Sequence, residues 1–130
     1  MAFVTVSDPQ VTAFAGTPAA NVLFSASVVG VKDQVKGSSA TVFGIKVDNS
    51  SNTVASYLKL WNLLATSVTV GTTDPDEIVM IPPGSKLFVI LNGVTGKVFG
   101  TALTVACVTT GGTGGTTPPG NRVQCEIALT

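Results

Sequence analysis

The stretch EIVMIPPGSKLFVIL, from Glu77 to Leu91, decides the fold of this chain. Two short runs rich in β-branched and aromatic residues, Glu77–Ile81 and Lys86–Leu91, stand on either side of Pro82-Pro83-Gly84. β-branched residues fit a pleated strand better than a helix, and proline followed by glycine is typical of a tight turn. The stretch therefore predicts two strands joined by a turn.

The same pattern continues outward through the 130 residues. The chain contains about 20 valines and about 18 threonines, and its 14 glycines and 7 prolines interrupt it at the spacing of a sandwich or barrel. The sequence predicts an all-β fold, a single-domain antiparallel β-sandwich that is jelly-roll-like and has about eight strands. The expected strands are Phe3–Ser7, Asn21–Val29, Ala40–Val47, Val54–Trp61, Val68–Val70, Glu77–Ile81, Lys86–Leu91, Val98–Thr109 and Arg122–Leu129.

Two segments are expected to lie outside this strand pattern. Val11–Ala20 contains Gly16 and Pro18 and is interpreted as extended, so residues 1–20 form an N-terminal arm and residues 21–130 the sandwich. Gly30–Ser39 is expected to be a loop.

The composition excludes several functions. The chain has no histidine, the commonest general base and metal ligand, and its two cysteines are too few for a Cys₄ zinc site. Seven basic residues balance seven acidic ones, so no net charge steers the chain toward nucleic acid or an anionic membrane. We expect no enzymatic activity, no catalytic residues, no cofactor and no metal. No apolar run is long enough for a membrane helix, and the first ten residues lack the basic start of a secretion signal.

Charged residues make up only 11% of the chain, against about 25% in ordinary soluble domains. A soluble chain with so little charge usually covers part of its surface with partners. This indicates a structural or binding role.

Three motifs invite a chemical interpretation. Asp74-Pro75-Asp76-Glu77 offers three carboxylates to Ca²⁺, but Pro75 stands at one of the ligand positions, so a turn is the preferred interpretation. Asp48–Asn52 supplies a single carboxylate and is interpreted as a hairpin turn. Gly111–Gly115 lacks the Lys-Ser/Thr that follows a phosphate-binding loop.

Cys107 and Cys125 flank the Gly-rich tract, on strands that we expect to be adjacent and antiparallel. A disulfide between them is geometrically possible, but buried free thiols are favoured for a chain that assembles in reducing cytoplasm. The tract Gly111–Gly120 contains five glycines, three threonines and two prolines. Because it offers almost no apolar surface to bury, we predict an exposed, mobile hairpin tip that tolerates an inserted peptide between Gly114 and Gly115.

The runs DNSSNTVASYLKLWN (Asp48–Asn62) and VGTTDPDEIVMIPPGSKLFVI (Val70–Ile90) resemble a pattern found in small virion proteins of tailed bacteriophages. That pattern has a strand ending in YLKLYN, then vGTt.P...i.vPaG, another strand and GF.TGL..A. The chain matches it at Tyr57–Asn62, Gly71–Thr73, Pro75, Pro83-Gly84 and Phe99–Leu103, and departs from it at Trp61 and Gly100. The resemblance covers about Ala40 to Ile127.

The resemblance implies a structural virion protein, most simply a capsid decoration (cement) protein on the outer surface of the major capsid protein lattice. Its localisation would be the virion, after assembly in the host cytoplasm, and its partner the major capsid protein. Low charge and short strands lead us to expect a homo-trimer, which matches the three-fold positions of an icosahedral lattice. A tail, baseplate or fibre component is the alternative, and a host-receptor or carbohydrate-binding module is a third possibility.

Two groups of residues are candidates for the interface. The first lies in the arm, where apolar residues alternate with Pro and Gly breaks: Phe3, Val4, Val6, Val11 and Phe14. The second is the set Tyr57, Lys59 and Trp61, which share one face of their strand and carry amphipathic groups suited to an interface. The arm forming the first strands of the sandwich, and Trp61 lying half-buried at a strand end, are the simpler alternatives.

Overall fold

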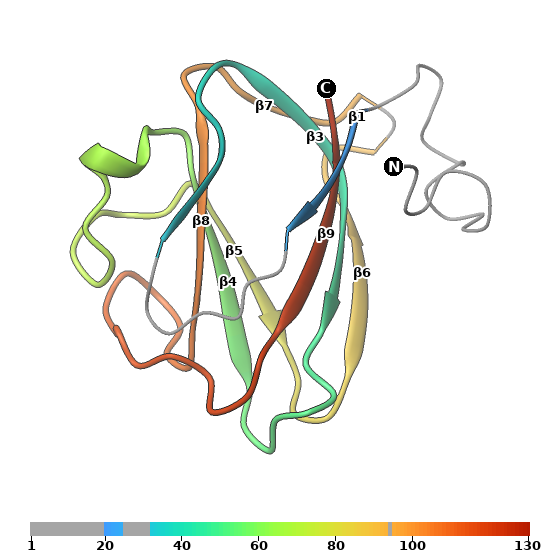
Figure 1. The fold of residues 1–130 in the computed structure, drawn as a ribbon, viewed down its shortest axis with the longest axis vertical. Coiled ribbons are helices and arrows are strands. Elements are labelled where there is room, and N and C mark those ends of the chain that lie inside the picture. The colour runs from blue at the N-terminus through green and yellow to red at the C-terminus, as the bar shows by residue number, and fades with distance from the viewer. Residues whose placement is uncertain (1–19, 25–31, 94) are drawn as a thin grey trace.

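Two antiparallel β-sheets packed face to face form the fold in the computed structural model, which describes residues 20–24, 32–93 and 95–130 (Figure 1). The strands are β1 (Ala20–Phe24), β2 (Asp33–Lys36), β3 (Ala40–Asp48), β4 (Ser56–Trp61), β5 (Glu77–Ile81), β6 (Lys86–Ile90), β7 (Lys97–Phe99), β8 (Leu103–Val108) and β9 (Gln124–Leu129). One turn of 3-10 helix, Ala65–Ser67, lies between β4 and β5.

The strand order is that of a jelly roll. Sheet A has the order β1-β9-β3-β6, with β7 also paired to β3, and sheet B has the order β2-β8-β4-β5. Successive strands cross repeatedly from one sheet to the other, which brings β1 beside β9 and β2 beside β8 although they are far apart in the chain. The predicted jelly-roll-like β-sandwich is therefore confirmed.

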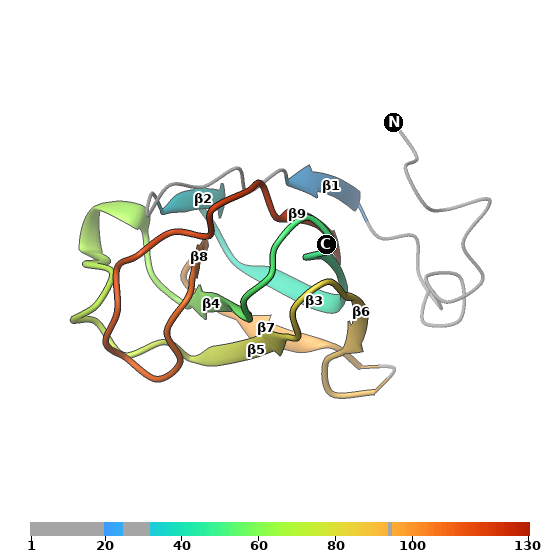
Figure 2. The same cartoon turned by 90° about the horizontal axis from the view of Figure 1, so that it is seen from below.

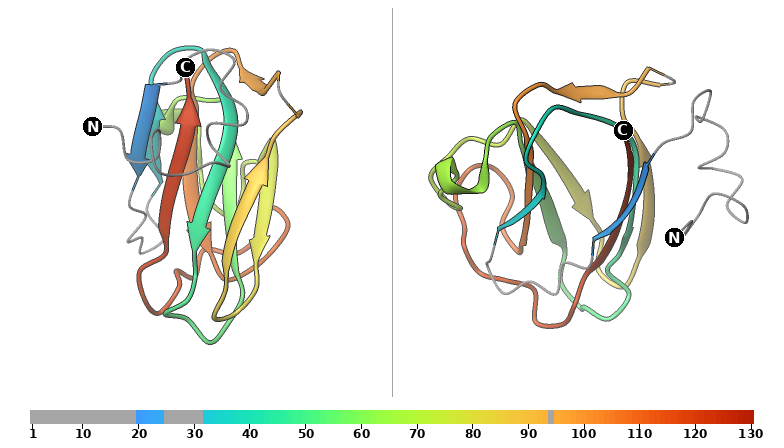
Figure 3. Two further views of the ribbon diagram at one scale, coloured as in Figure 1. Left: turned by 90° about the vertical axis from the view of Figure 1, so that its right-hand side faces the viewer. Right: turned by 45° about the horizontal axis from the view of Figure 1, so that its top comes forward.

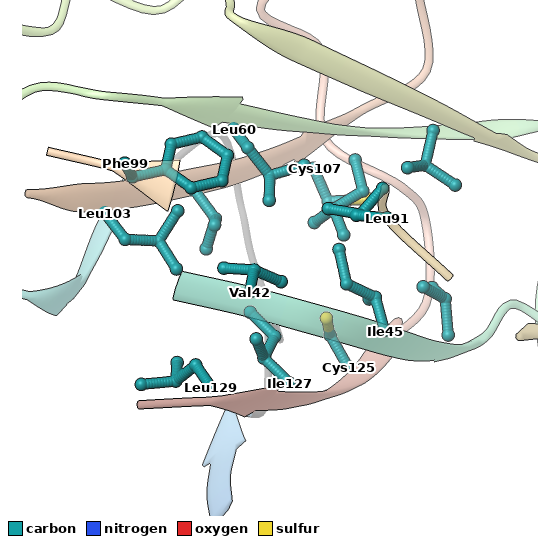
Figure 4. Packing of buried hydrophobic residues seen from close by; sticks show 14 of the residues in the cluster. Val42, Ile45, Leu60, Leu91, Phe99, Leu103, Cys107, Cys125, Ile127 and Leu129 are labelled. Carbon is teal, nitrogen blue, oxygen red and sulfur yellow. The ribbon is translucent and has the colours of Figure 1, made fainter. Parts of the chain in front are cut away.

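The sandwich core is built from alternating residues of both sheets. Ile45 and Val47 of β3 and Ile127 of β9 face Leu58 and Leu60 of β4 across it, and all are buried. Figure 4 shows further members from both sheets meeting in the same layer. This alternation is the period-two pattern of a strand with one face buried.

Three predicted elements differ in the structure. Part of the expected loop Gly30–Ser39 is a strand, β2, because Val35 packs against the core and β2 pairs with β8. Val68–Val70 is not a strand, since Val68 packs instead against Trp61 in a second apolar cluster. Val98–Thr109 is divided into β7 and β8, which belong to different sheets.

Both cysteines are buried and free, as predicted, but their strands are not adjacent. Cys107 lies on β8 in sheet B, and Cys125 lies on β9 in sheet A. The prediction of adjacent strands is wrong because the chain crosses the sandwich after β8 instead of forming a hairpin. The two thiols enter the core from opposite sheets (Figure 4).

Candidate binding surfaces

The arm candidates cannot be placed on the fold. Phe3, Val4, Val6, Val11 and Phe14 lie outside the described residues, as does the expected strand Phe3–Ser7. The interface prediction for this segment stays a prediction.

Tyr57, Lys59 and Trp61 do share the outward face of β4, because Leu58 and Leu60 point into the core. That face is nevertheless covered. Lys59 and Trp61 are fully buried, and Tyr57 is half-buried. The expectation of an open interface stripe is therefore wrong for Lys59 and Trp61, and Trp61 is more deeply buried than the half-buried alternative proposed.

Two loops cover this face of sheet B: the β4–β5 loop, residues 62–76, and the Gly-rich loop, residues 109–121. Figure 2 shows both on the same side of the molecule. The Trp61 indole N–H donates to the Thr73 carbonyl in the β4–β5 loop at 3.0 Å. Leu63, Val68 and Val70 of that loop pack with Trp61 around Ala106 of β8.

Lys59 binds the Gly-rich loop to the sheet. Its ammonium donates to the carbonyls of Gly114 at 2.8 Å and Thr113 at 3.4 Å. In the described part of the chain Lys59 has no carboxylate partner, and burial lowers the pKa of its ammonium below the ordinary value. Among the described residues, the ammonium is therefore held by backbone carbonyls of the Gly-rich loop.

Further contacts hold the Gly-rich loop in place. The Thr113 hydroxyl donates to the Asp74 carboxylate, which joins the two covering loops. The Thr109 N–H donates to the Thr117 carbonyl at 2.9 Å, so the loop also closes on itself. The predicted hairpin tip is wrong, because the loop joins β8 and β9, which lie in different sheets. Gly112, Gly114 and Thr116 are exposed as predicted, although these hydrogen bonds anchor a segment that has little apolar surface of its own. The mobility of the loop and its tolerance of an inserted peptide stay predictions.

The acidic run beside this loop has three separate partners. Asp74 accepts from Thr113, Asp76 accepts from the Asn62 N–H at 2.7 Å, and Glu77 pairs with Lys97 at 2.7 Å. Each carboxylate thus fastens a different neighbour to the loop or to β5. Among the described residues, no group of three or more Cys, Asp or Glu side chains could hold a metal ion.

A buried amide network joins turns that lie at the lower end of the ribbon in Figure 1, and the sequence did not predict it. Asn49 donates from Nδ2 to the carbonyls of Val54 and Pro82, both at 3.1 Å, and accepts at Oδ1 from Asn52 and Ser56. Asn52 in turn exchanges hydrogen bonds with the Asn121 backbone. The turn Asp48–Asn52 was predicted, but its asparagines also tie together the turns before β4, β6 and β9, which no local pattern reveals.

The thiols of Cys107 and Cys125 are unreactive in the folded state. Burial raises the pKa of Cys107 to about 12, and burial also raises the pKa of Cys125. A thiol that stays protonated and inaccessible is neither a nucleophile nor a metal ligand. The cysteines are core residues.

Open apolar surface lies elsewhere, mainly on three strands at one edge of the sandwich. Ile78 and Met80 of β5, Ile90 of β6 and Val98 of β7 are all exposed. Two more exposed apolar residues, Val54 and Leu64, lie in loops. The sequence reading placed the first four in strands but did not identify them as surface.

No family model, curated protein or solved structure matches the chain. Within the part of the chain that the structure describes, no helix has the length and apolar character needed to cross a membrane. The described residues thus form a jelly roll with exposed apolar side chains on the strands β5, β6 and β7.

Proposed function

We propose that this chain is a structural virion protein of a tailed bacteriophage, and most specifically a capsid decoration protein that binds the major capsid protein lattice. The observation that carries the proposal is the set of exposed apolar side chains on β5, β6 and β7, beside which the charges of Lys97 and Glu77 are paired within the chain. Such a surface suits binding by apolar burial, which needs neither a net field nor a catalytic group.

The sequence resemblance is the reason for proposing a virion protein, and the residues that carry the resemblance have structural roles in this fold. Tyr57–Asn62 covers β4 from its second residue and the first residue after it, and Pro83-Gly84 lies in the turn before β6. The Asn62 side chain accepts from the Thr101 N–H at 2.7 Å, which joins the first motif to the last. The motif residues thus act together in one fold, which supports reading them as one pattern.

Attachment would combine many weak contacts. A decoration protein is present in many copies, so each contact can be modest while the set is durable. A homo-trimer at the three-fold positions of the lattice would hold three such contacts together. The N-terminal arm would act as a clamp on the capsid.

The first experiment counts copies per particle. Virions of the phage whose genome encodes the chain are purified, and the protein is quantified against the major capsid protein. Hundreds of copies per particle support decoration, and a few to a few tens favour the tail, baseplate or fibre alternative. Absence from purified particles overturns both.

The second experiment tests the arm. Every described strand lies beyond Met1–Thr17, so deletion of residues 1–17 should leave β circular dichroism intact and abolish binding to undecorated capsids. Full binding by the truncated protein would remove the arm from the attachment mechanism. Loss of β structure would instead assign the arm to the sandwich.

A further inference from the structure

The connection between β6 and β7 contains the only Asn-Gly pair of the chain, Asn92-Gly93. Both residues are exposed, and both have a positive φ, +53° at Asn92 and +59° at Gly93. Asparagine adopts this left-handed region more readily than most residues that have a side chain. Figure 3 (left) shows the chain between β6 and β7, coloured yellow to orange, at the outer margin of the sandwich. The pair therefore lies in a sharp turn that is open to water.

The carboxamide of Asn92 is not engaged by this turn. The Asn92 backbone carbonyl accepts from the Thr95 N–H at 3.3 Å and from the Thr95 hydroxyl at 2.9 Å. Within the described residues, no hydrogen bond holds the Asn92 side chain or the N–H of Gly93. A Cβ built at Gly93 would have no atom within 4 Å, so the space beside this peptide bond is open. The carboxamide can thus turn toward the next peptide nitrogen without losing a hydrogen bond of its own.

The other asparagines differ from Asn92 in both respects. Glycine leaves its peptide nitrogen uncrowded because it has no Cβ, and each of the other asparagines precedes a residue that has one. Four of these asparagines also have hydrogen-bonded side chains: Asn49, Asn52, Asn62 and Asn121. The sequence and the hydrogen bonding therefore single out the same residue.

We propose that Asn92 is a site of spontaneous deamidation, a modification that goes beyond the proposed function and does not depend on it. The Gly93 backbone nitrogen attacks Cγ of Asn92, the bond from Cγ to the side-chain nitrogen breaks, and ammonia leaves with the proton of the Gly93 N–H. Water then adds to one of the two carbonyl carbons of the resulting cyclic imide. The ring opens at its nitrogen, which takes a proton from that water. The products are aspartate and isoaspartate at position 92.

The modification changes the charge of the protein. The unmodified chain balances seven basic residues against seven acidic ones, so one new carboxylate gives it a net negative charge. That carboxylate lies two residues from Ile90, which is 50% exposed. A charge beside an apolar side chain opposes the burial of both. Deamidation would therefore make the surface next to β6 less suited to an apolar contact.

Peptide mapping tests the site directly. The purified protein is incubated at mildly alkaline pH, where base removes the Gly93 amide proton, and timed samples are unfolded and digested with trypsin. Cleavage after Lys86 and Lys97 releases residues 87–97, a peptide in which Asn92 is the only asparagine. Mass spectrometry detects the replacement of NH₂ by OH in this peptide. Ion exchange detects the added charge of the intact protein, with Asn92→Asp as the reference.

Two variants and one internal control make the test specific. Gly93→Ala places a Cβ beside the attacking nitrogen, and Asn92→Gln lengthens the side chain that must close the ring. Circular dichroism checks that both variants fold. Asn121 is the internal control, because it is exposed like Asn92 but donates from its side chain to the Ser51 carbonyl at 2.7 Å.

In the wild type, the 87–97 peptide should be modified before the peptide that contains Asn121, and a more acidic form should elute with Asn92→Asp. Gly93→Ala should be modified at least about tenfold more slowly, and Asn92→Gln should not give the acidic form. Modification of the 87–97 peptide in urea but not in the folded protein would show that the turn protects Asn92 and would overturn the inference. Earlier modification of another asparagine, or equal rates for the wild type and Gly93→Ala, would also overturn it.

Discussion

Replacing Asn49 by alanine should remove the link between three turns of the sandwich. The Asn49 side chain is fully buried. Its amide donates toward the carbonyls of Val54, Ile81 and Pro82 at 3.1–3.3 Å, and its oxygen accepts from Asn52 at 2.9 Å and Ser56 at 2.8 Å. Since an NH₂ group has two protons, the side chain can make four good hydrogen bonds at a time.

The number of hydrogen bonds that Asn49 makes sets the expected loss of stability. At about 1 kcal/mol for each net hydrogen bond, Asn49→Ala should lower the free energy of unfolding by about 3–4 kcal/mol. For a chain of this length that corresponds to a fall of about 10–15 °C in Tm. The loss is a large part of a total stability of about 5–15 kcal/mol, so the variant should fold but with a small margin.

Urea unfolding measures this loss, with Trp61 as the sole tryptophan reporter. The matched control is Thr53→Ala, an exposed position in the same turn, which should change stability by less than about 0.5 kcal/mol. A loss below about 1 kcal/mol for Asn49→Ala, at an unchanged urea dependence, would refute the view that this network holds the turns together.

Asn49→Asp provides a pH test of the same network. The carboxylate keeps the two accepted bonds but faces the carbonyls without a proton, so burial should raise its pKa above the unfolded value of about 3.9. Its ionisation is then opposed by folding, and the variant loses stability relative to the wild type as the pH rises from about 4 through the raised pKa. A stability difference that does not vary with pH would contradict this reasoning.

Three further outcomes are expected. Burial lowers the pKa of Lys59 below its ordinary value of 10.5. The free energy of unfolding of the wild type should therefore rise, relative to that of Lys59→Met, as the pH increases from the lowered pKa toward 10.5. Urea titrations across that range measure the difference, and a difference that does not change with pH would count against the buried charge. Gly115→Ala should lower the free energy of unfolding by about 2–4 kcal/mol, because φ is +91° and the new Cβ would lie 2.4 Å from the Cβ of Thr110. Gly112→Ala, where φ is +69° and no atom lies near the new Cβ, should lower it by about 1–2 kcal/mol in the same urea assay. Equal losses for the two variants would refute the packing argument. Both buried thiols should resist a thiol reagent in the native protein and react fully in urea, whereas rapid native labelling would show that the core opens.

The parts of the fold that the sequence predicted are those set by local pattern. Strands over Glu77–Ile81 and Lys86–Leu91 were predicted from β-branched runs around Pro82-Pro83-Gly84. β5 occupies the first of these ranges, and β6 occupies Lys86–Ile90. The alternation in β4 correctly separated Leu58 and Leu60 from the opposite face. Period-two patterning records which way a side chain points, so these predictions needed no knowledge of the tertiary structure.

The parts that failed depend on contacts between distant segments. The alternation in β4 could not reveal that residues 109–121 fold back over Lys59, because that contact joins positions 55 residues apart in the chain. The same limit applied to Cys107 and Cys125, where the chain crosses between sheets instead of forming a hairpin. A Gly-rich tract predicts the absence of a core of its own, but not whether another element will supply hydrogen bonds to its backbone.

The covering of sheet B narrows where a partner can bind. Trp61 and Ala106 would make the outer face of β4 and β8 an apolar surface, but the β4–β5 loop and the Gly-rich loop bury it. On the strands whose side chains the structure describes, the exposed large apolar side chains are Ile78 and Met80 of β5, Ile90 of β6 and Val98 of β7. Apolar burial is favoured roughly in proportion to the area removed from water, so a partner that binds in this way gains most by covering these side chains. In the proposed function they are therefore the described surface that would meet the capsid lattice, beside the N-terminal arm.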